Sequence, residues 1–92
     1  MANYIVSFEF SGPRLTDQDM DQHMGKAGWV RRKILESAWY VSADESTSDV
    51  FNRLQKTLSP NDRLIVVNAA EALWRNLLIP DASLQVAFHS SG

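Results

Sequence analysis

The chain has 92 residues, of which 45% are hydrophobic and 22% charged, a composition typical of a folded globule and not of a disordered segment. It contains no cysteine, which excludes disulfide bonds and thiolate metal sites. The net charge of −2 argues against a protein that binds nucleic acid over its whole surface. No signal peptide and no bilayer-spanning apolar run are visible, so we expect one cytoplasmic domain over residues 1–92, without a membrane partner.

The first predicted element is a strand over residues 3–11, which ends at Gly12-Pro13. Its side chains alternate between two faces, so the carboxylate of Glu9 shares a face with Ile5 and Ser7. A charged side chain is unusual in a strand that buries itself, and Glu9 therefore becomes the first candidate for a functional residue. The opposite face carries Tyr4, Val6, Phe8 and Phe10.

A short helix follows, because Thr16 and Asp19 have the spacing of a capping box and Met20 and Met24 share one helical face. Gly28 ends this helix.

The middle of the chain alternates again from Val30 to Ser42, which predicts one long strand. Residues 48–58 carry an apolar stripe and predict a second helix. A turn at 59–62 follows, and the continuous apolar run 64–67 predicts a strand buried on both faces.

The last part of the chain predicts two further elements. Residues 71–78 group Leu73, Trp74, Leu77 and Leu78 and predict a short helix, and the alternation of Leu84, Val86 and Phe88 predicts a final strand.

The order of these elements matches the split βαβ pattern of an α+β, ferredoxin-like βαββαβ fold with an extra short helix and C-terminal strand. In that fold an antiparallel sheet carries two helices on one face and leaves the other face bare. Apolar side chains from the long second strand and the final strand would lie there. We therefore expect a homodimer, because a bare apolar face in a small protein usually meets a partner.

The basic cluster of the chain follows Trp29 and comprises Arg31, Arg32 and Lys33. Cations beside an aromatic side chain suit a nucleic-acid strand, and the start of a solvated strand is the alternative. His23 and His89 lack partners at the spacing of zinc ligands, and the acidic residues 17–21 lack the glycine of a calcium loop.

Glu9 by itself cannot hold Mg²⁺ tightly, because this ion prefers octahedral oxygen coordination. Two copies of Glu9 across a two-fold axis could bind one ion that activates a water. The alternative is an ion pair at the sheet edge with Arg14 or Arg63.

Several segments resemble a known family. The run Ile5-Val6-Ser7-Phe8-Glu9-Phe10, the segment Glu36 to Val41 and the segment Asn61 to Val67 are similar to the smaller universal protein of the CRISPR-associated adaptation family. Ser59 to Leu64 and Trp74 to Leu78 look like the stand-alone SinR-like branch of small bacterial proteins, and the VapD nucleases look similar in fold.

The resemblance implies a ferredoxin-like homodimer that is a metal-dependent nuclease in some members and a structural adaptor in others. In the family's motif an aspartate follows the aromatic residue of the first strand, and this chain has Glu9 there. The resemblance thus implies a Mg-dependent endonuclease acting on RNA or DNA, with Glu9 as catalytic residue and metal ligand and Ser7 and Ser11 lining the site. Arg14 would contact phosphate, and Arg31, Arg32 and Lys33 would guide the strand. The competing hypothesis is a non-catalytic dimeric adaptor, or an interaction protein of the toxin–antitoxin kind, with a protein partner.

Overall fold

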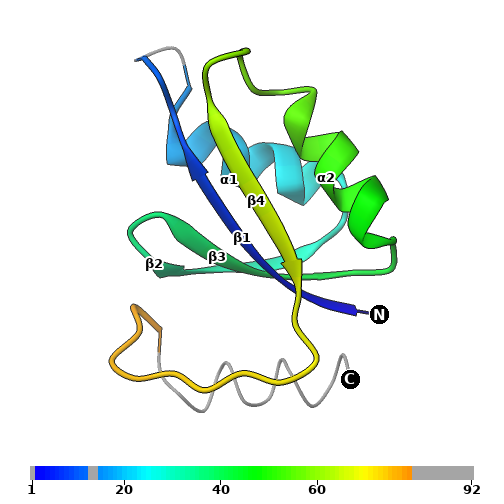
Figure 1. The fold of residues 1–92 in the computed structure, drawn as a ribbon, viewed down its shortest axis with the longest axis vertical. Helices are drawn as coiled ribbons and strands as arrows, with labels where there is room; N and C mark the ends of the chain where they lie inside the picture. The colour runs from blue at the N-terminus through cyan, green and yellow to red at the C-terminus, as the bar shows by residue number, and fades with distance from the viewer. Residues whose placement is uncertain (1, 13–14, 80–92) are drawn as a thin grey trace.

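The computed structural model describes residues 2–12 and 15–79 of the chain (Figure 1). Over these residues the chain forms a four-stranded antiparallel sheet of order β2-β3-β1-β4 with two helices, which is the ferredoxin-like topology predicted from the sequence. The elements are β1 (Ala2–Glu9), α1 (Asp17–Lys26), β2 (Val30–Leu35), β3 (Ala38–Ala43), α2 (Thr47–Gln55) and β4 (Arg63–Asn68).

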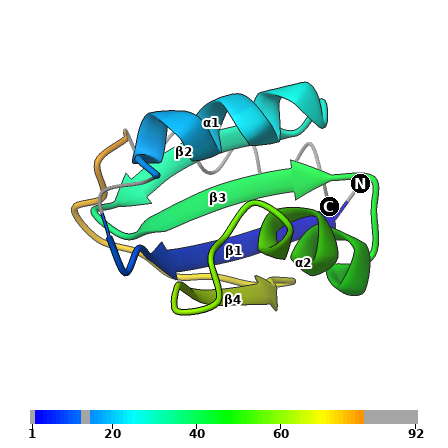
Figure 2. The same ribbon diagram turned by 90° about the horizontal axis from the view of Figure 1, so that it is seen from above.

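Both helices lie on one face of the sheet, with α1 over β2 and β3 and α2 over β1 and β4 (Figure 2). The capping box predicted for α1 is present: the Asp19 backbone N–H donates to the Thr16 hydroxyl, and Asp19 accepts from the Thr16 backbone. Ser46 caps α2 in a similar way through the backbone N–H of Asp49. These caps satisfy backbone donors that would otherwise lack partners at the helix starts.

The main core lies between the helices and the sheet. β1 is a central strand, and its predicted alternation is confirmed, since Tyr4, Val6 and Phe8 are buried toward the helices whereas Glu9 is exposed. The core is completed by Met20, Met24, Trp29, Trp39, Val41, Ala43, Val50 and Leu54.

The long strand predicted over 30–42 is wrong, because the chain folds there into the hairpin of β2 and β3. Leu35 pairs with Ala38, so Glu36 and Ser37 form a two-residue turn. A bulge between Lys33 and Leu35 shifts the register by one residue. Beyond the bulge, Trp39 of β3 lies on the helix side and packs in the main core.

The strand predicted at 64–67 is present as β4, but it is not buried on both faces. β4 pairs with β1 and is an edge strand of the sheet. Its outer face, directed away from the helices, leaves Ile65 58% and Val67 44% exposed.

The short helix predicted at 71–78 is absent from the structure. Asn76 has a positive φ of 54°, which interrupts a right-handed helix. The segment instead runs irregularly along the outer face of the sheet, and Trp74, Leu77 and Ile79 pack against Ile34, Ala38 and Tyr40. The predicted final strand at 84–88 lies outside the described residues.

The outer face is therefore not bare over β2 and β3, contrary to the sequence-based expectation. Beneath the covering segment the Tyr40 hydroxyl donates to Asn3 Oδ1 at 2.6 Å, so polar groups buried there are hydrogen-bonded. Among the described residues, no helix is both long and apolar enough to cross a membrane.

Candidate functional site

Glu9 is the last residue of β1, and its side chain is 65% exposed on the outer face. Arg63 lies opposite it in the register of β1 and β4, and its Nη1 approaches Glu9 Oε1 at 3.4 Å. The ion pair with Arg63 offered as the alternative is thus present. Arg14, the other candidate partner and the predicted phosphate contact, lies outside the described residues.

The two serines predicted to line the site have other partners. The Ser7 hydroxyl donates to the backbone oxygen of Ser37 at 2.8 Å. Ser11 donates to Asp62 Oδ1 from its backbone N–H at 2.7 Å and from its hydroxyl at 2.8 Å. Both serines therefore tie β1 and its continuation to neighbouring turns.

Asp62 is the best-bound carboxylate at this end of the sheet. Hydrogen bonds from the backbone N–H of Ser11, then from that of Ser59, lower the pKa of Asp62 to about 2. These bonds stabilise the ionised form and join the turn after α2 to the end of β1. Asp62 thus has a structural task that the sequence did not reveal.

The described residues of one chain do not by themselves fit a magnesium ion. Within residues 2–12 and 15–79, no three carboxylate or imidazole side chains form a group that could hold a metal. Glu9 supplies a single carboxylate that is already close to Arg63. A second copy of the chain could supply a further carboxylate.

The basic cluster is divided between the two faces of β2. Arg31 Nε donates to Asp21 at 2.9 Å, and Lys33 Nζ donates to Asp17 at 2.5 Å, so both cations face acidic residues of α1. The hydrogen bond to Asp17 raises the pKa of Lys33. Arg32 is exposed, and its guanidinium donates to the backbone oxygen of Arg31.

Arg31 also explains a glycine inside α1. A Cβ at Gly25 would lie 2.9 Å from Arg31 Nη2, so glycine at this position leaves room for the guanidinium on its way to Asp21. The register connects Arg31 to Val41 and then to Tyr4, five residues before Glu9 on β1. The structure therefore does not bring the basic cluster together with Glu9.

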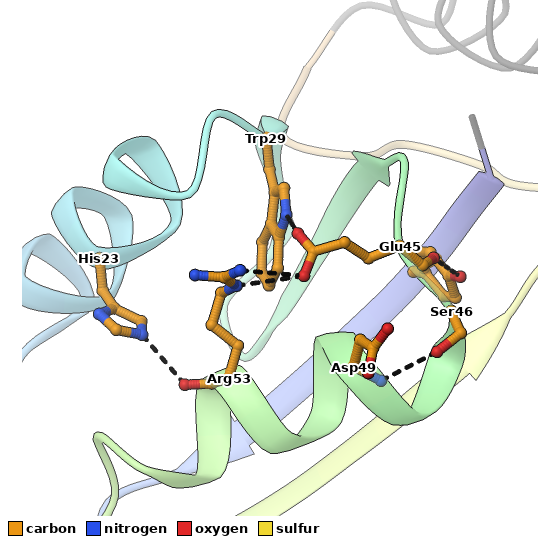
Figure 3. Close-up of polar contacts among 7 residues, drawn as sticks. His23, Trp29, Glu45, Ser46, Asp49 and Arg53 are labelled. Carbon is orange, nitrogen blue, oxygen red and sulfur yellow. Dashed lines mark hydrogen bonds and ion pairs between the residues drawn. The ribbon is translucent and has the colours of Figure 1, made fainter.

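A polar network that the sequence did not predict joins the two helices (Figure 3). Glu45 accepts a hydrogen bond from Trp29 Nε1 at 2.6 Å and one from Arg53 Nε at 3.2 Å. The guanidinium carbon of Arg53 lies 5.9 Å from the centre of the Trp29 ring, within cation–π range. The three residues come from separate parts of the chain, and no spacing rule relates them.

His23 extends this network from α1. Its Nε2 lies 3.1 Å from the backbone oxygen of Arg53, and because a carbonyl only accepts, Nε2 must carry the hydrogen. An open hollow of ≈ 540 Å³ lies beside these groups. Glu45 and Arg53 form an ion pair, and His23 and Trp29 bond to these two residues. These contacts of His23, Trp29, Glu45 and Arg53 connect α1 to α2, and we call them the brace between the helices. The hollow is lined by His23, Glu45, Asp49, Asn52, Arg53 and Lys56.

Comparison of the chain with protein-family models, with curated proteins and with solved structures finds no match. The resemblance to the CRISPR-associated adaptation family stays a prediction from short motifs. The fold and the geometry of the described residues therefore carry the functional argument.

Proposed function

We propose that this protein is a homodimeric interaction module that acts through the β1–β4 half of its sheet, without a catalytic centre of its own. The observation that carries the proposal is the exposure of Ile65 and Val67 on the outer face of β4. They lie opposite Ser7 and Ile5 of β1 and form an apolar surface that the segment 69–79 leaves uncovered. Apolar side chains gathered in this way favour contact with a partner.

A second copy of the chain fits this surface. Two outer faces related by a two-fold axis would cover Ile65 and Val67 of both copies with each other. Glu9 and Arg63 lie at the rim with opposite charges, so each can pair with its counterpart in the other copy. The apolar centre supplies affinity and the charged rim sets the orientation.

Multi-angle light scattering of the wild type and of Ile65→Asp tests this proposal. We expect a dimer at micromolar concentration for the wild type and a monomer for the variant, because a carboxylate would be desolvated in the interface. Leu73→Asp is the matched control, since Leu73 is 96% exposed outside the sheet, and this variant should stay dimeric. A monomeric wild type would overturn the proposal.

The second candidate is a Mg-dependent endonuclease acting on RNA or DNA, as the family resemblance implies. The observation that favours it is that Glu9 is exposed on the same outer face as Ile65 and Val67, so the dimer brings a second Glu9 to that side. Cleavage of RNA and DNA with Mg²⁺ or Mn²⁺ by the wild type and Glu9→Gln separates the candidates. Cleavage that Glu9→Gln abolishes supports the nuclease, and no cleavage by either protein supports the interaction module.

A further inference from the structure

We infer that the open edge of β4, together with the groove between β4 and α2, binds an extended peptide segment of another protein as an added β-strand. The inference rests on the proposed interaction module and names the chemistry of its partner. Addition of a strand to a sheet edge supplies affinity through main-chain hydrogen bonds and specificity through alternate side chains.

The first observation is the direction of the backbone groups on β4. Ala69 N–H donates to the backbone oxygen of Asn3 at 2.8 Å, which places the hydrogen-bonded pairs of β1 and β4 at the odd-numbered residues. Phe8 N–H, an even-numbered donor, bonds toward β3 at Ser37, as this alternation requires.

The even-numbered residues of β4 therefore direct their N–H and C=O groups away from β1. These residues are Leu64, Val66 and Asn68, which gives an incoming strand three donors and three acceptors. In the part of the chain that the structure describes, no strand pairs with this edge. An unpaired edge of this kind is a template for another strand.

The second observation is a groove of ≈ 350 Å³ beside this edge, on the helix side of the sheet. Phe51 of α2, Leu58, Pro60 and Leu64 supply its apolar lining. Gln55, Ser59 and Asp62 also border the groove, and the Asp62 carboxylate accepts hydrogen bonds from Ser11 and Ser59. The groove therefore suits an apolar side chain from the added strand.

The third observation concerns the outer side of the same edge. Ile65 and Val67 are exposed and β-branched, and side chains of an added strand that point outward would lie beside them. Arg63 begins β4 with its side chain 82% exposed, so an acidic residue at that end of the peptide would pair with it. The partner is thus an apolar, β-branched segment with an acidic residue at one end.

The experiment measures binding of a fluorescein-labelled peptide of alternating valine and threonine that ends in glutamate, by fluorescence anisotropy. In the variant Val66→Pro the outward N–H is removed while the bonds to β1 remain, because proline is tolerated on the open side of an edge strand. We expect binding at least ~10-fold weaker than for the wild type, since one main-chain bond is lost and the ring crowds the edge. Val66→Thr keeps the N–H and should bind like the wild type.

Phe51→Glu provides a second variant that does not alter the sheet, because Phe51 is exposed on α2. A carboxylate in the groove should also weaken binding by at least ~10-fold. Unchanged binding in both Val66→Pro and Phe51→Glu, or no binding by the wild type, would overturn the inference.

Light scattering on the same variants distinguishes this inference from the proposed dimer. If Val66→Pro alone turns a wild-type dimer into a monomer, a second copy occupies the edge, and the inference of a peptide partner is overturned. If the wild type is monomeric and still binds the peptide, the homodimer fails and the peptide site is supported. If the wild type is dimeric and binds no peptide, the dimer holds and the peptide site fails.

Discussion

The two sides of the sheet differ in how their charged groups are used. On the helix side, Glu45 binds both Trp29 and Arg53, and the cations of Arg31 and Lys33 face acidic residues of α1. On the outer side of β1 and β4, Glu9 and Arg63 form an ion pair in which both side chains are largely exposed.

This difference indicates where function should be sought. A charged group that braces two helices is already neutralised and partly desolvated, so recruiting it for ligand binding costs stability. Groups at an exposed edge carry no such cost. Most of the basic cluster, which the sequence suggested for nucleic acid, is already paired with acidic residues of α1. The charged groups of the β1–β4 surface are exposed and free of that cost.

Among the substitutions that test this difference between the two sides of the sheet, we expect the largest loss of stability in the core beneath the helices. Leu54 of α2 is fully buried, and Leu54→Ala should lower the free energy of unfolding by about 2–5 kcal/mol through lost burial and a cavity. Leu73, which is 96% exposed, is the matched control, and Leu73→Ala should change the free energy of unfolding by less than about 0.5 kcal/mol. Urea unfolding measures both, and equal losses would contradict the packing described.

A smaller loss is expected at the brace between the helices. Glu45→Gln removes the charge that Arg53 and Trp29 share, and should lower the free energy of unfolding by about 1–2 kcal/mol. Glu36, whose side chain is 91% exposed in the hairpin turn, is the control. If Glu36→Gln is as destabilising as Glu45→Gln in urea unfolding, the brace does not stabilise the fold.

The parts of the fold that the sequence predicted correctly depend on neighbouring residues. Thr16 and Asp19 are three residues apart, and their capping box follows from that spacing alone. The alternation of β1 likewise needs no knowledge of distant residues. Such local patterns predicted β1, α1, α2 and β4, but not the division of residues 30–43 into β2 and β3.

The parts that failed depend on contacts between distant segments. The two turn residues are Glu36 and Ser37, whereas glycine, asparagine or proline at these positions would have indicated a hairpin turn. Trp74 and Leu77 have helical spacing, yet they cover Ile34 and Tyr40 from a chain that is not helical. Tertiary packing decided both cases over local pattern.

The candidate site also contains contacts that the sequence predicted and contacts that it did not. The sequence offered the pairing of Glu9 with Arg63, but it could not show that Arg31 and Lys33 would face α1. The network of Glu45 joins three separate segments and leaves no local signal. Groups that the fold assembles from distant segments are therefore the ones that sequence patterns missed.

The acid dependence of stability provides the next test. Folding lowers the pKa of Asp62 from 3.8 to about 2. The hydrogen bonds of the ionised carboxylate therefore stabilise the fold fully above the unfolded-state pKa, and this stabilisation is lost as the pH falls through the folded-state pKa. The difference in unfolding free energy between the wild type and Asp62→Asn should therefore be constant above about pH 5 and shrink between about pH 4 and pH 2. Urea unfolding across this range measures the difference, and a difference that persists unchanged at pH 2 would contradict the hydrogen bonds to Ser11 and Ser59.

The smallest effect is expected at the pair that the sequence singled out. In a double-mutant cycle of Glu9→Gln and Arg63→Gln, the coupling energy should be about 0.5 kcal/mol or less and should decrease with salt, because both side chains are largely exposed. Urea unfolding at low and high ionic strength, with Ile65→Asp present in every variant so that the protein is monomeric, measures this coupling energy. A coupling well above 1 kcal/mol would show that this pair braces the sheet as Glu45 and Arg53 brace the helices, and the contrast between the two sides would no longer hold. A small coupling leaves Glu9 and Arg63 available to a second copy or to a peptide at the edge of β4.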